Sequence, residues 1–278
     1  KTGALALIGD LSRSSSEHTS LMNTLEGFFG IGAIIGPAIV ATLIARGLSW
    51  KWLYVIAAAV CALLIVLAAR ARYPAAQHTS SPPNMRLTLR LLRDPFVLGF
   101  SALVMLYVAV EVAIYVWMPT YLESYTGGVT WLPVYALSIF FVLRAAGRFA
   151  GAWLLRRFEW TTALLMLASG ILLCFGGALI GGVGTGVFTL PASGLFMSMM
   201  YPTLNSKAIS CFPRNLHGSV AGIVLCFTAA AAALGPLAMA AVGDHFGNVA
   251  FAFGLATGFA FLLLAGLVYN WLAEPAKE

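Results

Sequence analysis

GIGAIIGPAIVATLIARGLSWKWLYVIAA, residues 30–58, and AAAALGPLAMAAVGDHFGNVAFAFGLAT, residues 230–257, share a Gly-Pro pair in similar apolar surroundings. Gly36-Pro37 and Gly235-Pro236 are each followed by a short polar turn and an aromatic-rich segment. The pairs lie 199 residues apart, the length of about six membrane helices with loops. A single Gly-Pro pair is equally consistent with a simple helix kink. Its recurrence favours an internal repeat, which is how many secondary transporters are built.

The composition excludes most soluble classes of protein. Of the 278 residues, 60% are hydrophobic and 9% are charged, whereas roughly a quarter are charged in an ordinary soluble domain. The basic residues lie in short connections rather than on one solvated face, so we do not expect nucleic-acid binding. The four cysteines are widely spaced without a CxxC pair, so we expect neither a metal site nor a cofactor.

Apolar blocks of about 20 residues indicate membrane helices, so we expect an all-α polytopic membrane protein. Eight segments qualify as full transmembrane helices: 22–45, 52–69, 95–122, 131–155, 161–181, 184–210, 218–242 and 248–272. A shorter apolar stretch at 2–9 is typical of the tail of another helix. The stretch 70–94 is read as a linker because it carries three prolines and five arginines.

The internal repeat and the position of the linker allow these helices to be numbered. Residues 1–69 are expected to hold the tail of helix four and helices five and six of an N-terminal bundle. Residues 70–94 would be a basic linker, and residues 95–278 a C-terminal bundle of helices seven to twelve. We therefore expect most of the first four helices to lie outside this sequence. Eight spans alone would leave the cavity open to lipid and could not transport.

Basic residues in the connections predict the orientation. Eleven lie on one side, including the linker arginines, Arg156, Arg157 and Lys207, whereas only Arg46 and Lys51 lie on the other. Because short cytoplasmic loops carry the excess of Lys and Arg, we expect the linker and the C-terminus to be cytoplasmic. The expected location is the plasma membrane, which in a bacterium is the inner membrane.

The loop after residue 155 resembles the signature of the major facilitator superfamily. Within GRFAGAWLLRRFEWTTALLM, residues 147–166, the matching positions are Gly151, Leu154, Arg156, Arg157 and Leu164, while the usual loop Asp is absent. Four segments are similar to the fucose-permease-like branch of sugar:proton symporters: EVAIYVWMPTYL (111–122), RAAGRFAG (144–151), FMSMMYPTLNS (196–206) and MNTLEGFFGIGAIIGP (22–37). The resemblance implies the major-facilitator fold, a central cavity, alternating access and coupling to protons. Gly36, Pro37, Gly151, Arg156, Arg157, Gly235 and Pro236 would then be structural or gating positions.

Charges at mid-membrane depth are expensive and usually face a cavity or a partner. Glu111 and Arg144 lie about 16 and 20 Å from the outer ends of their helices, so the two side chains can meet. They would either bind a solute and respond to protonation or form a static pair that holds two helices together. Glu26, with Asn23 one turn earlier, is another candidate titratable group. A carboxylate favoured by the helix dipole is the equal alternative there.

Sugar sites combine hydrogen-bonding groups with aromatic faces. The candidates for substrate binding are Asn23, Glu26, Glu111, Trp117, Tyr121, Arg144, Tyr201 and Asn205. With the resemblance, they predict a transporter in the lipid bilayer for a small polar solute, a sugar, with protons as the second partner. The full-length protein is expected to be monomeric. A proton-coupled exporter of drug-like compounds is the alternative, because Gly32 and Gly36-Pro37 resemble an exporter signature. An intramembrane enzyme is disfavoured because the four histidines fall in loops or at helix ends.

Overall fold

A computed structural model describes residues 28–36, 39, 40, 42, 43, 46–71, 85–213 and 216–273. Regular structure in these residues is helical throughout. The chain divides into two compact units, residues 1–80 and 81–278. The boundary falls inside the expected linker.

In the first unit, residues 28–36 are helical and α3 spans Trp52–Arg70. The bounds of α3 match the expected span 52–69. None of its residues is buried, although it is one of the most apolar helices of the chain. A helix that is hydrophobic all round suits a lipid environment or a covering by other helices. Much of the expected span 22–45, with Pro37, lies outside the described residues.

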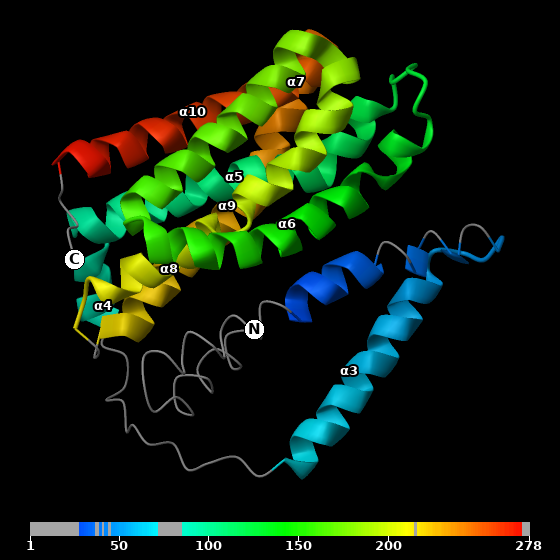
Figure 1. Ribbon diagram of the computed structural model, residues 1–278. Coiled ribbons are helices and arrows are strands. Elements are labelled where there is room, and N and C mark those ends of the chain that lie inside the picture. Colours follow the sequence, from blue (N-terminus) through cyan, green and yellow to red (C-terminus); the bar gives the residue numbers. More distant parts are fainter. Residues whose placement is uncertain are drawn as a thin grey trace. The chain divides into compact units, whose positions relative to one another are not determined.

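The second unit contains the remaining helices (Figure 1). In chain order they are α4 Met85–Leu91, α5 Pro95–Leu122, α6 Trp131–Arg157, α7 Trp160–Met197, α8 Met200–Ser210, α9 His217–Phe246 and α10 Val249–Ala273. α5 is central, because it contacts α6, α7, α8, α9 and α10. Its sharp start has a clear cause: the Asp94 carboxylate accepts hydrogen bonds from the backbone N–H groups of Phe96 and Val97, and Pro95 opens the first turn.

α7 is two antiparallel helices joined by a tight turn at Gly182. This residue has φ 64° and ψ −162°, a backbone conformation that only glycine adopts readily. A Cβ on Gly177 would lie 3.6 Å from Thr189, and one on Gly186 would lie 3.4 Å from Ala178. Residues on either side of the turn therefore face each other, as in a hairpin. The expected separate spans 161–181 and 184–210 meet at this turn.

The structure corrects the expectation of one continuous helix over 184–210. α7 ends at Met197 and α8 begins at Met200, with a break at residues 198 and 199. Pro202 explains the break. It has no N–H for the carbonyl of Ser198, four residues earlier, and its ring disfavours helical geometry there. The hydropathy of the sequence gave no sign of this interruption, because the residues on both sides are apolar.

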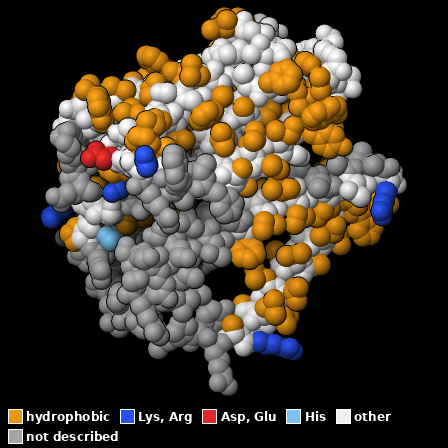
Figure 2. All heavy atoms as spheres, viewed as in Figure 1, with side chains coloured by type: hydrophobic (Ala, Val, Ile, Leu, Met, Phe, Trp, Pro, Cys, Tyr) orange, Lys and Arg blue, Asp and Glu red, His pale blue; other side chains and the backbone are white. Residues whose placement is uncertain are grey.

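Five helical stretches among the described residues are long and apolar enough to cross a membrane. One of them, Trp160–Ser210, is 51 residues long and contains the Gly182 turn, so it accounts for two crossings. α6 has 27 residues and includes four arginines, which lowers its hydropathy. Figure 2 shows apolar side chains over much of the visible described surface, with few charged side chains among them. This distribution suits a chain whose helices are surrounded by lipid.

Candidate functional site

A buried carboxylate marks the centre of α5. Glu111 lies near the middle of this 28-residue helix and is 8% exposed. Tyr107 and Tyr115 lie four residues before and after it, so the three side chains share one helix face. α5 therefore presents two phenols and a carboxylate in a single row.

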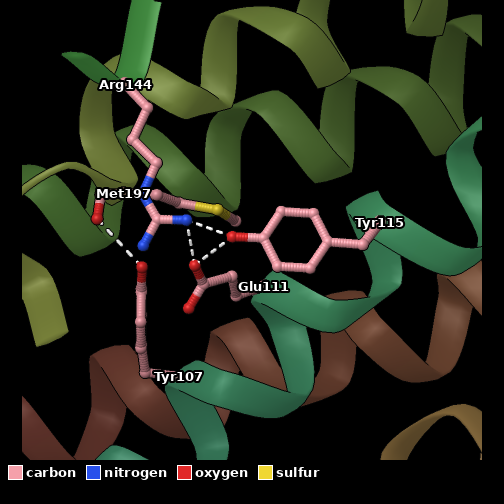
Figure 3. A network of polar contacts seen from close by, with 5 residues as sticks. All are labelled: Tyr107, Glu111, Tyr115, Arg144 and Met197. Atoms are coloured by element: carbon pink, nitrogen blue, oxygen red, sulfur yellow. Dashed lines mark hydrogen bonds and ion pairs between the residues drawn. The ribbon is translucent and has the colours of Figure 1, made fainter. Parts of the chain in front are cut away.

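Arg144 of α6 meets this row (Figure 3). Its Nη1 forms an ion pair with Glu111 Oε1 and donates a hydrogen bond to the Tyr115 hydroxyl. The Tyr115 hydroxyl in turn donates to Glu111 Oε1. The three groups thus form a closed triangle, and Tyr115 bridges acid and base. The expected meeting of Glu111 and Arg144 is confirmed.

Aromatic rings of α6 hold Tyr115 in place. The Phe141 ring stacks on it at a centroid distance of 5.5 Å, and the Phe140 ring meets it edge-on at 5.8 Å. Such pairs contribute about 0.5–1.5 kcal/mol beyond their area burial. The position of the phenol is therefore fixed by packing as well as by its hydrogen bonds.

Tyr107 connects this part of α5 to the break between α7 and α8. Its hydroxyl donates to the main-chain carbonyl of Met197, at 2.9 Å. Met197 is the last residue of α7, where carbonyls lose their helical partners. Figure 3 shows the Arg144 guanidinium between the hydroxyls of Tyr107 and Tyr115. The charged site and the break in the helix are thus neighbours.

Close backbone packing surrounds Arg144 on α6. A Cβ on Gly147 would lie 2.5 Å from the Leu195 carbonyl oxygen. A Cβ on Gly194 would lie 2.3 Å from the Phe140 carbonyl oxygen. Only glycine permits such approaches, so the backbones of α6 and the second half of α7 are in direct contact at the depth of the ion pair.

The site still has unused hydrogen-bonding capacity. Among the residues that the structure describes, Arg144 Nε is a buried donor without a hydrogen-bond partner, as is Trp117 Nε1 further along α5. A buried donor left unsatisfied costs about 1–3 kcal/mol. A bound water or the hydroxyl of a polar solute would relieve that cost.

A family model described as Major Facilitator Superfamily matches residues 2–236. The chain belongs to the Major Facilitator Superfamily. The match extends across both units and most of the described helices, so the superfamily resemblance at residues 147–166 is confirmed.

Solved structures share the superfamily fold. The crystal structure of a variant of the E. coli fucose:proton symporter FucP is 22% identical, covers 97% of this chain and 72% of the other, and has a TM-score of 0.71. A FucP structure in the outward conformation is 21% identical with the same coverage and a TM-score of 0.73. At these identities the likeness shows the fold alone, and it confirms the expected major-facilitator architecture.

Among curated proteins, a Protein TsgA homolog from Buchnera aphidicola subsp. Schizaphis graminum is 26% identical over 108 residues. The alignment covers 39% of this chain and 27% of that relative. The chain therefore matches only about a quarter of the length of this relative.

The other residues expected to bind a solute are placed in this superfamily fold as follows. Trp117 is half-buried on α5, and Tyr201 and Asn205 are half-buried on α8. Tyr121 has a structural contact, because its hydroxyl donates to the Ala178 carbonyl at 2.9 Å. Among the candidates that the structure describes, Glu111 and Arg144 are in direct contact. The binding roles of all the candidates stay predictions.

Several expected positions lie outside the described residues. They are Asn23, Glu26 and Pro37, together with the surroundings of Gly151 and the side chain of Arg156. Gly36 is described, and a Cβ there would meet nothing within 4 Å. Arg157 is exposed at the end of α6.

The second Gly-Pro pair lies where two helices cross. A Cβ on Gly235 would lie 3.5 Å from Ala109 of α5, and α9 continues as a helix through Pro236. Gly235 thus packs against α5 at Ala109, which lies two residues before Glu111. The contact supports the packing interpretation of the pair, and its gating role stays a prediction.

Sequence reasoning missed Tyr107 and Tyr115. The spacing that reveals them was available, because both lie one helical turn from Glu111. Tyr107 lies outside the quoted family segments. Tyr115 lies inside the segment 111–122 but was not singled out there. Within the described residues, no group of three or more His, Cys, Asp or Glu side chains could hold a metal ion.

Proposed function

We propose that this protein is a secondary active transporter that moves a small polar solute, a sugar, by alternating access coupled to protons. The observation that carries the proposal is the buried triangle of Glu111, Tyr115 and Arg144 at the centre of a superfamily fold. The fold similarity to the E. coli fucose:proton symporter FucP supports the choice of sugar. We place the protein in a bacterial inner membrane as a monomer, with the linker and C-terminus cytoplasmic.

The triangle suits solute binding because its members can exchange partners. Sugar hydroxyls donate and accept hydrogen bonds, and they can replace the Tyr115 hydroxyl between acid and base. Arg144 can engage a hydroxyl through its unpartnered Nε. Charged partners make such bonds stronger than neutral ones.

The same triangle supplies a way to couple protons. When Glu111 takes up a proton, its ion pair with Arg144 is lost and the guanidinium must find another acceptor. Because a buried charge without a partner is costly, protonation favours a rearrangement or a bound solute. Tyr107 lies next to both the guanidinium and the α7–α8 break. Loss of the Glu111–Arg144 ion pair can thus alter the contacts of Tyr107, and through them the break between α7 and α8.

Proton movement in energised vesicles tests this proposal. The full-length gene is expressed, and external pH is followed after fucose, or each of a panel of other monosaccharides, is added. Sugar-dependent proton entry supports the proposal. Proton movement in response to a lipophilic cation, with none for any sugar, would instead support the exporter and overturn it. Vesicles from cells without the gene are the control.

A further inference from the structure

α4 is a short helix that docks against the end of α9. The Thr88 hydroxyl donates to the Ser219 hydroxyl at 3.2 Å, and Leu91 is 7% exposed. These residues lie three apart, so one side of α4 rests on the bundle. The basic linker is therefore held to the C-terminal unit at this point.

The four described residues beside Thr88 and Leu91 are exposed, two in α4 and two in the turn that follows it. Leu89 is 56% exposed and Leu92 is 38% exposed. Arg90 and Arg93 are also exposed, and neither side chain forms an ion pair with any residue that the structure describes. The neighbouring Asp94 is occupied as the cap of α5. Two cations and two leucines are thus left facing the surroundings.

The level of α4 relative to the membrane follows from its neighbours. α5 begins at Pro95, directly after Arg93, and Ser219 belongs to the first turn of α9. Both α5 and α9 are long and apolar enough to span the bilayer. α4 therefore lies where spanning helices leave the hydrocarbon, at the depth of the lipid headgroups. Figure 1 places α4 at that end of the bundle.

We propose that α4 and the turn that follows it form an interfacial segment that binds anionic phospholipid headgroups through Arg90 and Arg93. Leu89 and Leu92 enter the boundary between headgroups and acyl chains, as in other interfacial helices. Charge complementarity favours an anionic lipid over a zwitterionic one, and the interleaved leucines favour a lipid over a soluble acidic partner. In the orientation that the basic residues predict, α4 faces the cytoplasmic leaflet, where anionic lipids attract juxtamembrane basic segments.

The effect of removing the charges follows from the usual strength of such contacts. About 1 kcal/mol per basic residue near an anionic surface corresponds to roughly fivefold in affinity each. Replacing both arginines should therefore weaken the tightest phosphatidylglycerol site about 25-fold. Binding of phosphatidylcholine should not change, because its headgroup is zwitterionic.

Native mass spectrometry of the purified protein, titrated with phosphatidylglycerol or phosphatidylcholine, tests the proposal. The variant R90Q/R93Q is compared with R46Q/K51Q, which removes the same charge from the first unit. We expect R90Q/R93Q alone to lose the tightest phosphatidylglycerol site. Unchanged binding in R90Q/R93Q, or an equal loss in R46Q/K51Q, would overturn the proposal.

A charge-conserving variant separates binding from folding. R90K/R93K keeps both cations and should retain phosphatidylglycerol binding within a few-fold of the wild type. A loss as large as in R90Q/R93Q would show that charge does not hold the lipid and would also overturn the proposal. None of these measurements depends on transport, so their outcome is independent of the proposed function.

Discussion

Replacing Arg144 with methionine tests whether the triangle is a true buried ion pair. Glu111 and Arg144 side chains are only about a tenth exposed, so neither charge is well solvated. R144M leaves the Glu111 carboxylate buried with the Tyr115 hydroxyl as its remaining partner in the triangle. Removing one member of a buried pair destabilises a protein by about 3–5 kcal/mol.

That free energy corresponds to a measurable loss of thermal stability. The second unit contains about 200 residues, and for a protein of that size 1 kcal/mol shifts the Tm by about 2–4 °C. R144M should therefore unfold roughly 6 to 20 °C below the wild type. Size-exclusion chromatography after heating in detergent measures the midpoint.

Two further variants make the measurement specific. R157Q removes an exposed arginine from the same helix and should shift the midpoint little, because exposed charges contribute about 0–1 kcal/mol. E111L/R144M removes both charges and should recover much of the loss. If R144M is no less stable than R157Q, the ion pair is not buried in the protein and the reasoning fails.

Three other outcomes are expected. G194V should lower the Tm by an amount equivalent to about 1–3 kcal/mol or more, because its Cβ would lie 2.3 Å from a backbone oxygen of α6. G176A should leave the Tm unchanged, because a Cβ there meets nothing within 4 Å. Equal shifts of the Tm in the two variants would contradict this prediction. Y107F should speed hydrogen exchange at residues 198 and 199, because the Met197 carbonyl loses its donor; unchanged exchange would show that the bond does not hold the break. Burial raises the pKa of the Cys211 thiol, so thiolate is scarcer below that pKa and maleimide labelling of Cys211 should need higher pH than labelling of glutathione; coinciding pH profiles would refute it.

Most helix positions could be predicted from the sequence because lipid imposes a simple rule. Every crossing needs about 20 apolar residues, and the bounds of α3 and α5 follow the apolar blocks closely. The Gly182 turn was placed correctly because the glycines around it interrupt the block. The break at residues 198 and 199 was not, because it depends on one missing N–H at Pro202 within an apolar run.

The candidate site was predicted in part for a related reason. Glu111 and Arg144 stand out because charges are rare inside apolar blocks, and equal depth predicts their contact. Tyr115 does not stand out, since an aromatic residue in a membrane helix is usually packing. Its role depends on the direction of one hydroxyl, which is set by Phe140 and Phe141 across the helix contact. Composition and spacing carry no information on that direction.

The role of Glu111 in proton coupling is tested most directly by comparing two modes of sugar movement in one variant. E111Q removes the titratable group and keeps a hydrogen-bonding side chain, and E123Q changes an exposed acid at the end of the same helix. In vesicles we expect E111Q to exchange labelled sugar for internal sugar but to lose uptake driven by a proton gradient. E123Q should retain both. Gradient-driven uptake in E111Q at the wild-type level, with the wild-type pH dependence, would contradict the proposed coupling.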